Sequence, residues 1–185
     1  APTDQYRHNM SCKQNIAEAK KLLKEAGYPN GIEMVIHVST KEPTWPTIAE
    51  VIQQQVAKAG IKVDIKMTPS KSYWKETWMK KDVAMTRWNE RSADSVLHEV
   101  YHSSAKWNES YYKSSDFDKN LADARGELDF KKRKALYVKA QHTLWEQSGT
   151  MIPYHVSKLV VTNSRVKNLD EVEVFSIQWH KVKVD

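Results

Sequence analysis

The chain has 185 residues, a formal net charge of +6 and an aromatic-rich composition with seven Trp and eight Tyr. This length can bury one sizeable core in one or two compact units, and no apolar run reaches the roughly 18 residues that a membrane-spanning helix needs. The single cysteine, Cys12, excludes an intrachain disulfide and argues against a thiolate metal site, while residues 1–15 lack the apolar segment of a signal peptide.

The first half of the chain predicts a strand–helix–strand unit. Residues 15–31 begin with helical spacing of apolar residues and end in a turn that contains two glycines and a proline. Residues 32–38 are rich in β-branched side chains and predict a strand, and residues 47–60 place their apolar side chains on one helix face. Residues 61–67 alternate apolar and polar, so one face of this second strand should be buried. The right-handed crossover rule makes the two strands parallel neighbours.

The second half predicts one further strand and several helices. A short helix over residues 70–81 precedes a third strand over residues 82–88. Helical patterns follow over residues 93–103, 115–128 and 129–148. The inward face of the longest helix is expected to hold Ala135, Leu136, Val138, Ala140, Leu144 and Trp145. The fold class is therefore α/β, with a mostly parallel central sheet flanked by helices.

The end of the chain carries weaker strand patterns. Residues 150–156 and 158–164 predict strands or extended edges, although Pro153 disfavours the first of them. The last twenty residues, 166–185, alternate in polarity without a clear partner for pairing.

The segment AMTRWNERSADS, residues 84–95, places Trp88 and Arg91 where the third strand ends. Ligands of open α/β sheets bind at the carboxyl ends of strands. Trp88 could stack on a ligand or cap the sheet, and Arg91 could bind an anion or pair with a carboxylate of its own loop, Glu90 or Asp94. Trp45 follows the first strand in the same way, as a cleft-rim residue or a packing residue.

The order of these segments resembles the C-terminal lobe of the family 5 extracellular solute-binding proteins. The likeness runs from AKKLLKEAGYPNG through IAEVIQQQVAKAGIKVDIKM, DVAMTRW and YKSSDFDKNLADAR to KKRKALYVKAQHTLWEQSGTMIPYH, about residues 15–165. The resemblance implies a periplasmic-binding-protein type II-like lobe over residues 1–165. It also implies that residues 166–185 form a tail packing on an N-terminal lobe that would lie outside this chain.

The same resemblance implies a function and partners. The protein would be the substrate-binding component of an ABC importer, holding a peptide or other small polar solute between two lobes and delivering it to a membrane permease. It would lie in the periplasm or on the extracellular face of the membrane, with a signal or lipid anchor in the missing N-terminal part. Neither enzymatic activity nor a cofactor is expected.

Site residues follow from the resemblance by position. Peptide-binding relatives carry a Trp followed three positions later by an Asp that pairs with the peptide amino terminus; here Trp88 matches the Trp, but Arg91 replaces the Asp. A guanidinium favours the opposite ligand charge and offers a fork for carboxylate or phosphate. Asp94 partly preserves the acidic character of this loop, and Asn108 and Tyr112 match an Asn–Tyr element beside the cleft. The expected ligand-binding residues are Trp45, Trp88, Arg91, Asp94, Asn108 and Tyr112.

One other function remains open. HEVYH, residues 98–102, fits the H-E-x-x-H pattern in which His98 and His102 hold zinc and Glu99 acts on a bound water. The glycine and third histidine of the extended motif are absent, but the alternative of a zinc metallopeptidase stands beside the binding function. The positive charge is dispersed over helix faces, as in DFKKRKALY, so we predict no nucleic-acid partner.

Overall fold

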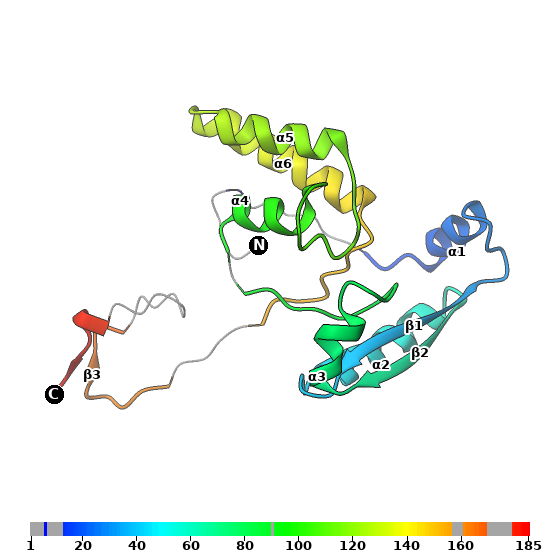
Figure 1. The fold of residues 1–185 in the computed structure, drawn as a ribbon, viewed down its shortest axis with the longest axis horizontal. Helices are drawn as coiled ribbons and strands as arrows, with labels where there is room; N and C mark the ends of the chain where they lie inside the picture. Colours follow the sequence, from blue (N-terminus) through cyan, green and yellow to red (C-terminus); the bar gives the residue numbers. More distant parts are fainter. Residues whose placement is uncertain (1–5, 7–12, 90, 157–160, 170–178) are drawn as a thin grey trace. The chain divides into compact units, whose positions relative to one another are not determined.

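The computed structural model describes residue 6 and residues 13–89, 91–156, 161–169 and 179–185. The chain separates into two compact units, Ala1–Gly149 and Thr150–Asp185. The first unit mixes helices with a parallel sheet (Figure 1), which confirms the predicted α/β class.

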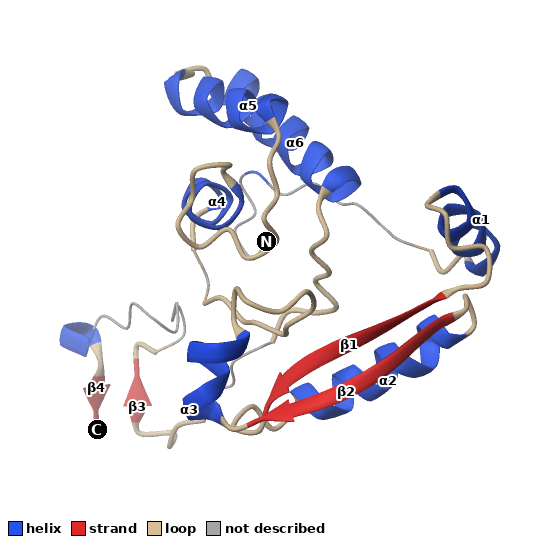
Figure 2. Cartoon of the chain, turned by 45° about the vertical axis from the view of Figure 1, so that its right-hand side comes forward, coloured by secondary structure: helices blue, strands red, loops and turns tan. Residues whose placement is uncertain are grey.

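The first unit opens with α1 (Ile16–Glu25), β1 (Ile32–Ser39), α2 (Trp45–Ala57) and β2 (Ile61–Thr68). The two strands pair in parallel over their whole length, from Ile32 opposite Ile61 to Ser39 opposite Thr68. Figure 2 shows α2 lying along this sheet. The buried core of this part consists of Ile36, Val38, Trp45, Ala49 and Val63 from the strands and α2, together with Tyr73 from the segment after β2. The predicted strand–helix–strand unit is confirmed.

Glycine is required where β1 and β2 begin. Gly31 and Gly60 both have positive φ, +88° and +94°, and the Ile32 amide donates to the Gly60 carbonyl at 3.2 Å. A Cβ on Gly31 would lie 2.0 Å from the Gly60 carbonyl oxygen. The two turns can approach this closely only because residue 31 carries no side chain, whereas at Gly60 an added Cβ would make an ordinary 3.6 Å contact and only the positive φ favours glycine.

The predicted third strand is reduced to a single bridge. Ala84 pairs in parallel with His37, whose amide donates to the Val83 carbonyl and whose carbonyl accepts from the Met85 amide, each at 3.0 Å. The Tyr73 hydroxyl donates to the Met85 carbonyl at 2.5 Å. In a longer strand this carbonyl would have accepted a backbone amide of β1 instead. The prediction of a strand over residues 82–88 was therefore wrong in its extent.

Two short helices each end in one π-helical turn. α3 (Ser70–Ser72) continues into the turn Tyr73–Thr77, and α4 (Ala93–Val96) continues into the turn Leu97–Tyr101. Turns of this kind insert one extra residue and often lie at functional sites.

The helices α5 (Ser115–Gly126) and α6 (Phe130–Gln147) lie side by side (Figure 1). The Ser114 and Asp129 side chains cap their first turns by accepting backbone amides. These helices share a second core with α4, made of Leu97, Val100, Tyr101, Tyr112, Phe117, Leu121, Ala124, Tyr137 and Ala140.

The predicted inward face of α6 is only partly right. Ala140 is buried, and Leu136 and Leu144 pack against the second core, but Ala135 and Trp145 are exposed. Tyr137 is buried in their place, since its hydroxyl can donate to a carboxylate within the packed helices.

The second unit carries a small antiparallel pair, β3 (Val166–Lys167) with β4 (Lys183–Val184), and a 3₁₀ turn over Trp179–Lys181. Residues 150–156 are exposed and form neither helix nor strand, so the strand predicted there was wrong; Pro153 has no amide to donate to a ladder. Residues 158–160 of the next predicted strand lie outside the described residues, and residues 161–163 have no regular structure. Throughout the described ranges, every helix is too short or too polar to cross a membrane.

Candidate functional site

The indole of Trp88 is anchored by the carboxylate of Glu109. Its Nε1–H donates to Glu109 Oε2 at 3.1 Å. The other oxygen, Oε1, accepts from the Thr86 hydroxyl at 2.9 Å and from the Trp78 indole N–H. Trp107 packs beside Trp88 with 5.7 Å between ring centroids. Because the segment leaves the sheet after the Ala84 bridge, parallel to β1, this cluster lies beyond the carboxyl end of the strands.

Arg91 lies over the Trp88 ring and pairs with Glu99. Its guanidinium carbon is 5.3 Å from the ring centroid, within the range of a cation–π contact. Its Nη1 donates to Glu99 Oε2 at 2.7 Å, and the Ser95 hydroxyl donates to Glu99 Oε1 at 2.9 Å. The Nε donor of Arg91 is buried and has no hydrogen-bond partner in the described part of the chain. About one third (34%) of the side chain is exposed.

The expected pairing of Arg91 within its own loop takes a different form. Its partner is Glu99 in the π-helical turn, whereas Glu90 lies outside the described residues. Asp94 accepts two hydrogen bonds from Arg125, at 2.7 and 2.8 Å, and one from the Tyr137 hydroxyl at 3.0 Å. The Arg125 hydrogen bonds lower the pKa of Asp94. This carboxylate therefore ties α4 to α5 and α6.

Asn108 and Tyr112 order the loop before α5. The buried Asn108 side chain donates to the Tyr112 carbonyl at 2.6 Å and accepts the Tyr112 amide at 3.1 Å. The Tyr112 ring packs edge-on against Phe117 in the second core. Both residues therefore act on the loop backbone and its packing.

Trp45 is placed in the sheet core. It is 5% exposed, and its ring lies 5.7 Å from that of Tyr73 and 6.4 Å from that of Trp74. Of the two roles expected for Trp45, the structure shows packing. The six expected residues therefore divide into a partly exposed pair, Trp88 and Arg91, and four that support the surrounding structure.

Sequence reasoning missed the two acidic partners of this pair, Glu99 and Glu109. The sequence pattern indicates Glu99 only as part of a zinc motif. Glu109 follows Asn108 directly in the sequence, but its contact with Trp78 spans 31 positions. No local pattern indicates a contact across that distance.

The side chains of the H-E-x-x-H segment make other contacts instead of forming a zinc site. The rings of His98 and His102 lie 4.8 Å apart. However, Glu99 is held by Arg91 and Ser95, and Arg125 Nη1 lies 3.3 Å from His98 Nδ1, where its positive charge opposes a bound cation. The described residues contain no group of three or more His, Cys, Asp or Glu side chains placed to hold a metal ion.

The environment of His98 predicts a loss of stability in mild acid. Partial burial, then the positive charges of Arg125 and His102, lower the pKa of His98 below its ordinary value. The unfolded chain therefore binds the proton first, and the free energy of unfolding should fall as pH decreases through about 6.5. We expect His98→Gln to reduce this dependence in urea denaturation between pH 8 and pH 5.5, while His37, whose pKa is also lowered by burial, keeps part of it. Replacement of the exposed His155 by Gln should leave most of it in place; equal effects of both variants would contradict the prediction.

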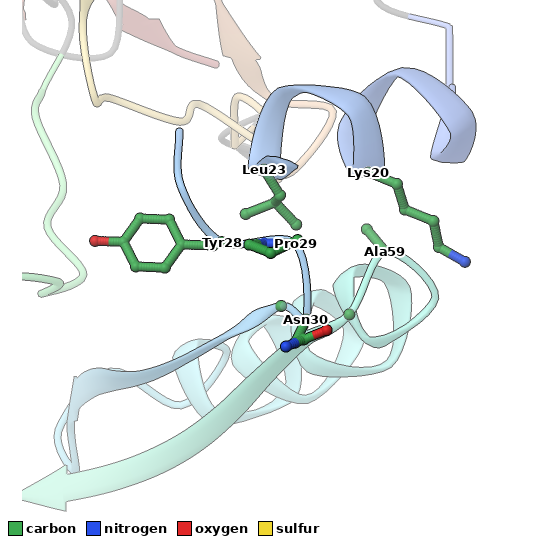
Figure 3. Close-up of a pocket in the computed structure, with 8 residues that line it drawn as sticks. Lys20, Leu23, Tyr28, Pro29, Asn30 and Ala59 are labelled. Carbon is green, nitrogen blue, oxygen red and sulfur yellow. The ribbon is translucent and has the colours of Figure 1, made fainter. Parts of the chain in front are cut away.

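A surface hollow of about 230 Å³ lies elsewhere, between the end of α1 and the turns that precede β1 and β2. Figure 3 shows Leu23, Tyr28 and Asn30 around it. It lies at the amino ends of the strands, and none of the expected ligand-binding residues lines it.

Comparison with known proteins identifies related chains. The family model described as "Bacterial extracellular solute-binding proteins, family 5 Middle" matches residues 1–108. The glutathione-binding protein GsiB of Salmonella choleraesuis (strain SC-B67) is 32% identical over 161 residues, covering 80% of this chain and 31% of GsiB. The chain thus spans less than a third of the length of this relative.

Two solved structures give the same picture. The ABC transporter-associated periplasmic binding protein DppA from Helicobacter pylori, in complex with peptide STSA, aligns at a TM-score of 0.63 and 35% identity, over 70% of this chain and 27% of DppA. MoaA from A. tumefaciens R10, in complex with mannopinic acid, aligns at a TM-score of 0.61 and 29% identity, over 70% of this chain and 28% of MoaA.

Proposed function

The chain belongs to the family 5 bacterial extracellular solute-binding proteins, and we propose that it is part of a receptor that binds a small carboxylate-bearing solute for an ABC importer. The family is one of solute-binding proteins that are periplasmic or extracellular, and we place the full protein there. The observation that carries the proposal is the partly exposed Arg91 side chain, whose guanidinium lies over the Trp88 ring beyond the carboxyl end of the sheet.

The chemistry of this pair favours a flat or apolar group next to an anionic one. An indole stacks on flat or apolar parts of a ligand, and a guanidinium donates two parallel hydrogen bonds to a carboxylate. Glutathione, the peptide STSA and mannopinic acid, which the names of the related proteins carry, all contain a carboxylate. Peptides and sugar acids are therefore the first solutes to test.

Glu99 sets a condition on binding. It already neutralises part of the Arg91 charge through the 2.7 Å ion pair. An anionic solute must share the guanidinium with this carboxylate or displace it. The site should therefore prefer solutes whose other contacts, including those to Trp88, compensate for the competition.

We further propose that residues 1–165 form one lobe and that residues 166–185 run back to another lobe of the same parent protein. The chain covers less than a third of GsiB, which is compatible with a longer parent. Ligand contacts on both lobes would favour a closed state that the permease recognises.

A binding measurement on the full-length parent tests the proposal. Calorimetric titration with reduced glutathione, the peptide STSA and mannopinic acid should find at least one ligand. Arg91→Ala should then weaken binding by about tenfold or more, and Arg91→Lys by less, since lysine keeps the charge without the two-donor fork. The exposed Lys139→Ala on α6 removes an equal charge elsewhere and should leave affinity unchanged.

Glu99→Gln separates a ligand contact from a structural ion pair. It removes the competing negative charge and should preserve or tighten binding of an anionic solute. If Glu99→Gln and Arg91→Ala weaken binding equally, Arg91 acts only through its pairing with Glu99. Failure of all three solutes to bind the unaltered parent would contradict the proposed solute class.

A further inference from the structure

We propose that Glu109 is a positioning residue for the ligand site, which holds the Trp88 indole in the orientation that a ligand meets. This inference rests on the proposed function, because it concerns the same site. It adds a residue that neither the resemblance nor the sequence pattern indicates.

The first argument is the number of donors on one carboxylate. Glu109 accepts from the indoles of Trp78 and Trp88 and from the Thr86 hydroxyl. These donors come from two segments, one following α3 and one leaving the sheet at Ala84. Hydrogen bonds to a charged acceptor are about twice as strong as neutral ones. One side chain therefore joins both segments at the site.

The second argument is the geometry of an indole. Trp has a single donor, Nε1–H, at one edge of its ring. The χ2 torsion of an aromatic side chain has a broad range of allowed values, so packing alone does not fix the orientation of the ring. A fixed acceptor at the Nε1 edge removes this freedom, and Trp107 restricts the ring further. Because the ring is already ordered before binding, the entropic cost of ligand binding is lower.

The third argument is that the Glu109 backbone is itself fixed. Its amide donates to the Trp107 carbonyl at 2.8 Å. Its neighbour Asn108 is locked by two hydrogen bonds to the Tyr112 backbone. Asn108 thus fixes the loop that carries Glu109, and Glu109 in turn fixes the Trp88 indole. Asn108 therefore supports the site indirectly.

Indole N–H resonances of the ¹⁵N-Trp-labelled full-length parent test the contact without a ligand. The signals of Trp78 and Trp88 are assigned by their loss in Trp78→Phe and Trp88→Phe. We expect Glu109→Gln to move both, whereas Glu50→Gln, on the exposed face of α2, should move neither. An unchanged Trp88 signal in Glu109→Gln would overturn the inference.

A double-mutant cycle tests the effect on binding, with whichever of reduced glutathione, STSA and mannopinic acid binds the unaltered parent. Glu109→Gln should weaken its affinity by about tenfold. In a Trp88→Phe background the same change should weaken affinity less than about twofold, because the N–H that it acts through is gone. Fully additive losses would show a general structural role and overturn the inference. If no probe binds, the proposed solute class is contradicted, and the Trp88 resonance still decides whether Glu109 holds the indole.

Discussion

Gly31→Ala is expected to lower the free energy of unfolding by about 3 kcal/mol, one of the largest effects of a single methyl group in this chain. The positive φ of +88° alone costs a residue with a side chain about 1–2 kcal/mol. The added Cβ would also lie 2.0 Å from the Gly60 carbonyl oxygen, a backbone atom that cannot rotate away. Relief requires β1 and β2 to separate where they begin. Urea denaturation measures the change.

Variants at two other glycines distinguish the cost of the positive φ from the cost of the contact with the Gly60 carbonyl. Gly27 has a φ of +91° but open space where an added methyl group would lie, so Gly27→Ala should cost only about 1 kcal/mol. Gly126, at the end of α5, has neither a positive φ nor a close neighbour, and Gly126→Ala should be neutral or stabilising by a few tenths of a kcal/mol. A loss for Gly31→Ala no larger than that for Gly27→Ala would contradict the close approach.

Asn108→Asp is expected to destabilise the unligated protein by about 3 kcal/mol at pH 7. The substitution preserves shape but replaces the amide donor with an oxygen, which would face the Tyr112 carbonyl now 2.6 Å from Nδ2. Burial and this repulsion should raise the pKa of the introduced carboxyl above its unfolded value. The penalty is therefore full above the raised pKa and disappears as pH falls below about 4.

Two further variants test whether the effect at Asn108 comes from its hydrogen bonds to Tyr112. Asn108→Ala should cost about 2 kcal/mol, because it leaves the amide and carbonyl of Tyr112 without these partners. Asn30→Asp, at an exposed position, should change stability by less than about 0.5 kcal/mol. If both Asn108 variants retain full stability without ligand, the residue does not order the loop and a direct ligand contact becomes the better interpretation.

The strand–helix–strand unit was predictable because its signals are local. Residues 61–67 alternate in polarity, and the structure pairs them in parallel with β1. The third strand was overestimated because its end depends on the Tyr73 hydroxyl, a group about twelve positions away in sequence. The β-branched and aromatic residues of this segment indicate an extended backbone, but they do not indicate how many of its backbone amides form hydrogen bonds with a neighbouring strand.

The closeness of two candidate residues was predictable, but their partners were not. Trp88 and Arg91 were singled out because they follow an apolar segment, and the structure brings their side chains together; that they bind a ligand stays a prediction. Their partners, Glu99 and Glu109, are set by tertiary packing of the π-helical turn and the loop before α5. Trp45 and Asp94 took structural roles for the same reason, since burial and a facing arginine come from other elements.

The aromatic contacts around Glu109 have an optical consequence. Trp74 lies 5.8 Å from Trp78, Trp88 lies 5.7 Å from Trp107, and Trp78 and Trp88 meet at one carboxylate. Because these rings lie so close together, we expect excitation energy to transfer between them, so that the emission of one ring depends on its neighbours. A solute that contacts one of these rings should therefore change the tryptophan emission of the group, which Trp45 extends at 6.4 Å from Trp74, so that binding can be followed by intrinsic fluorescence without a dye.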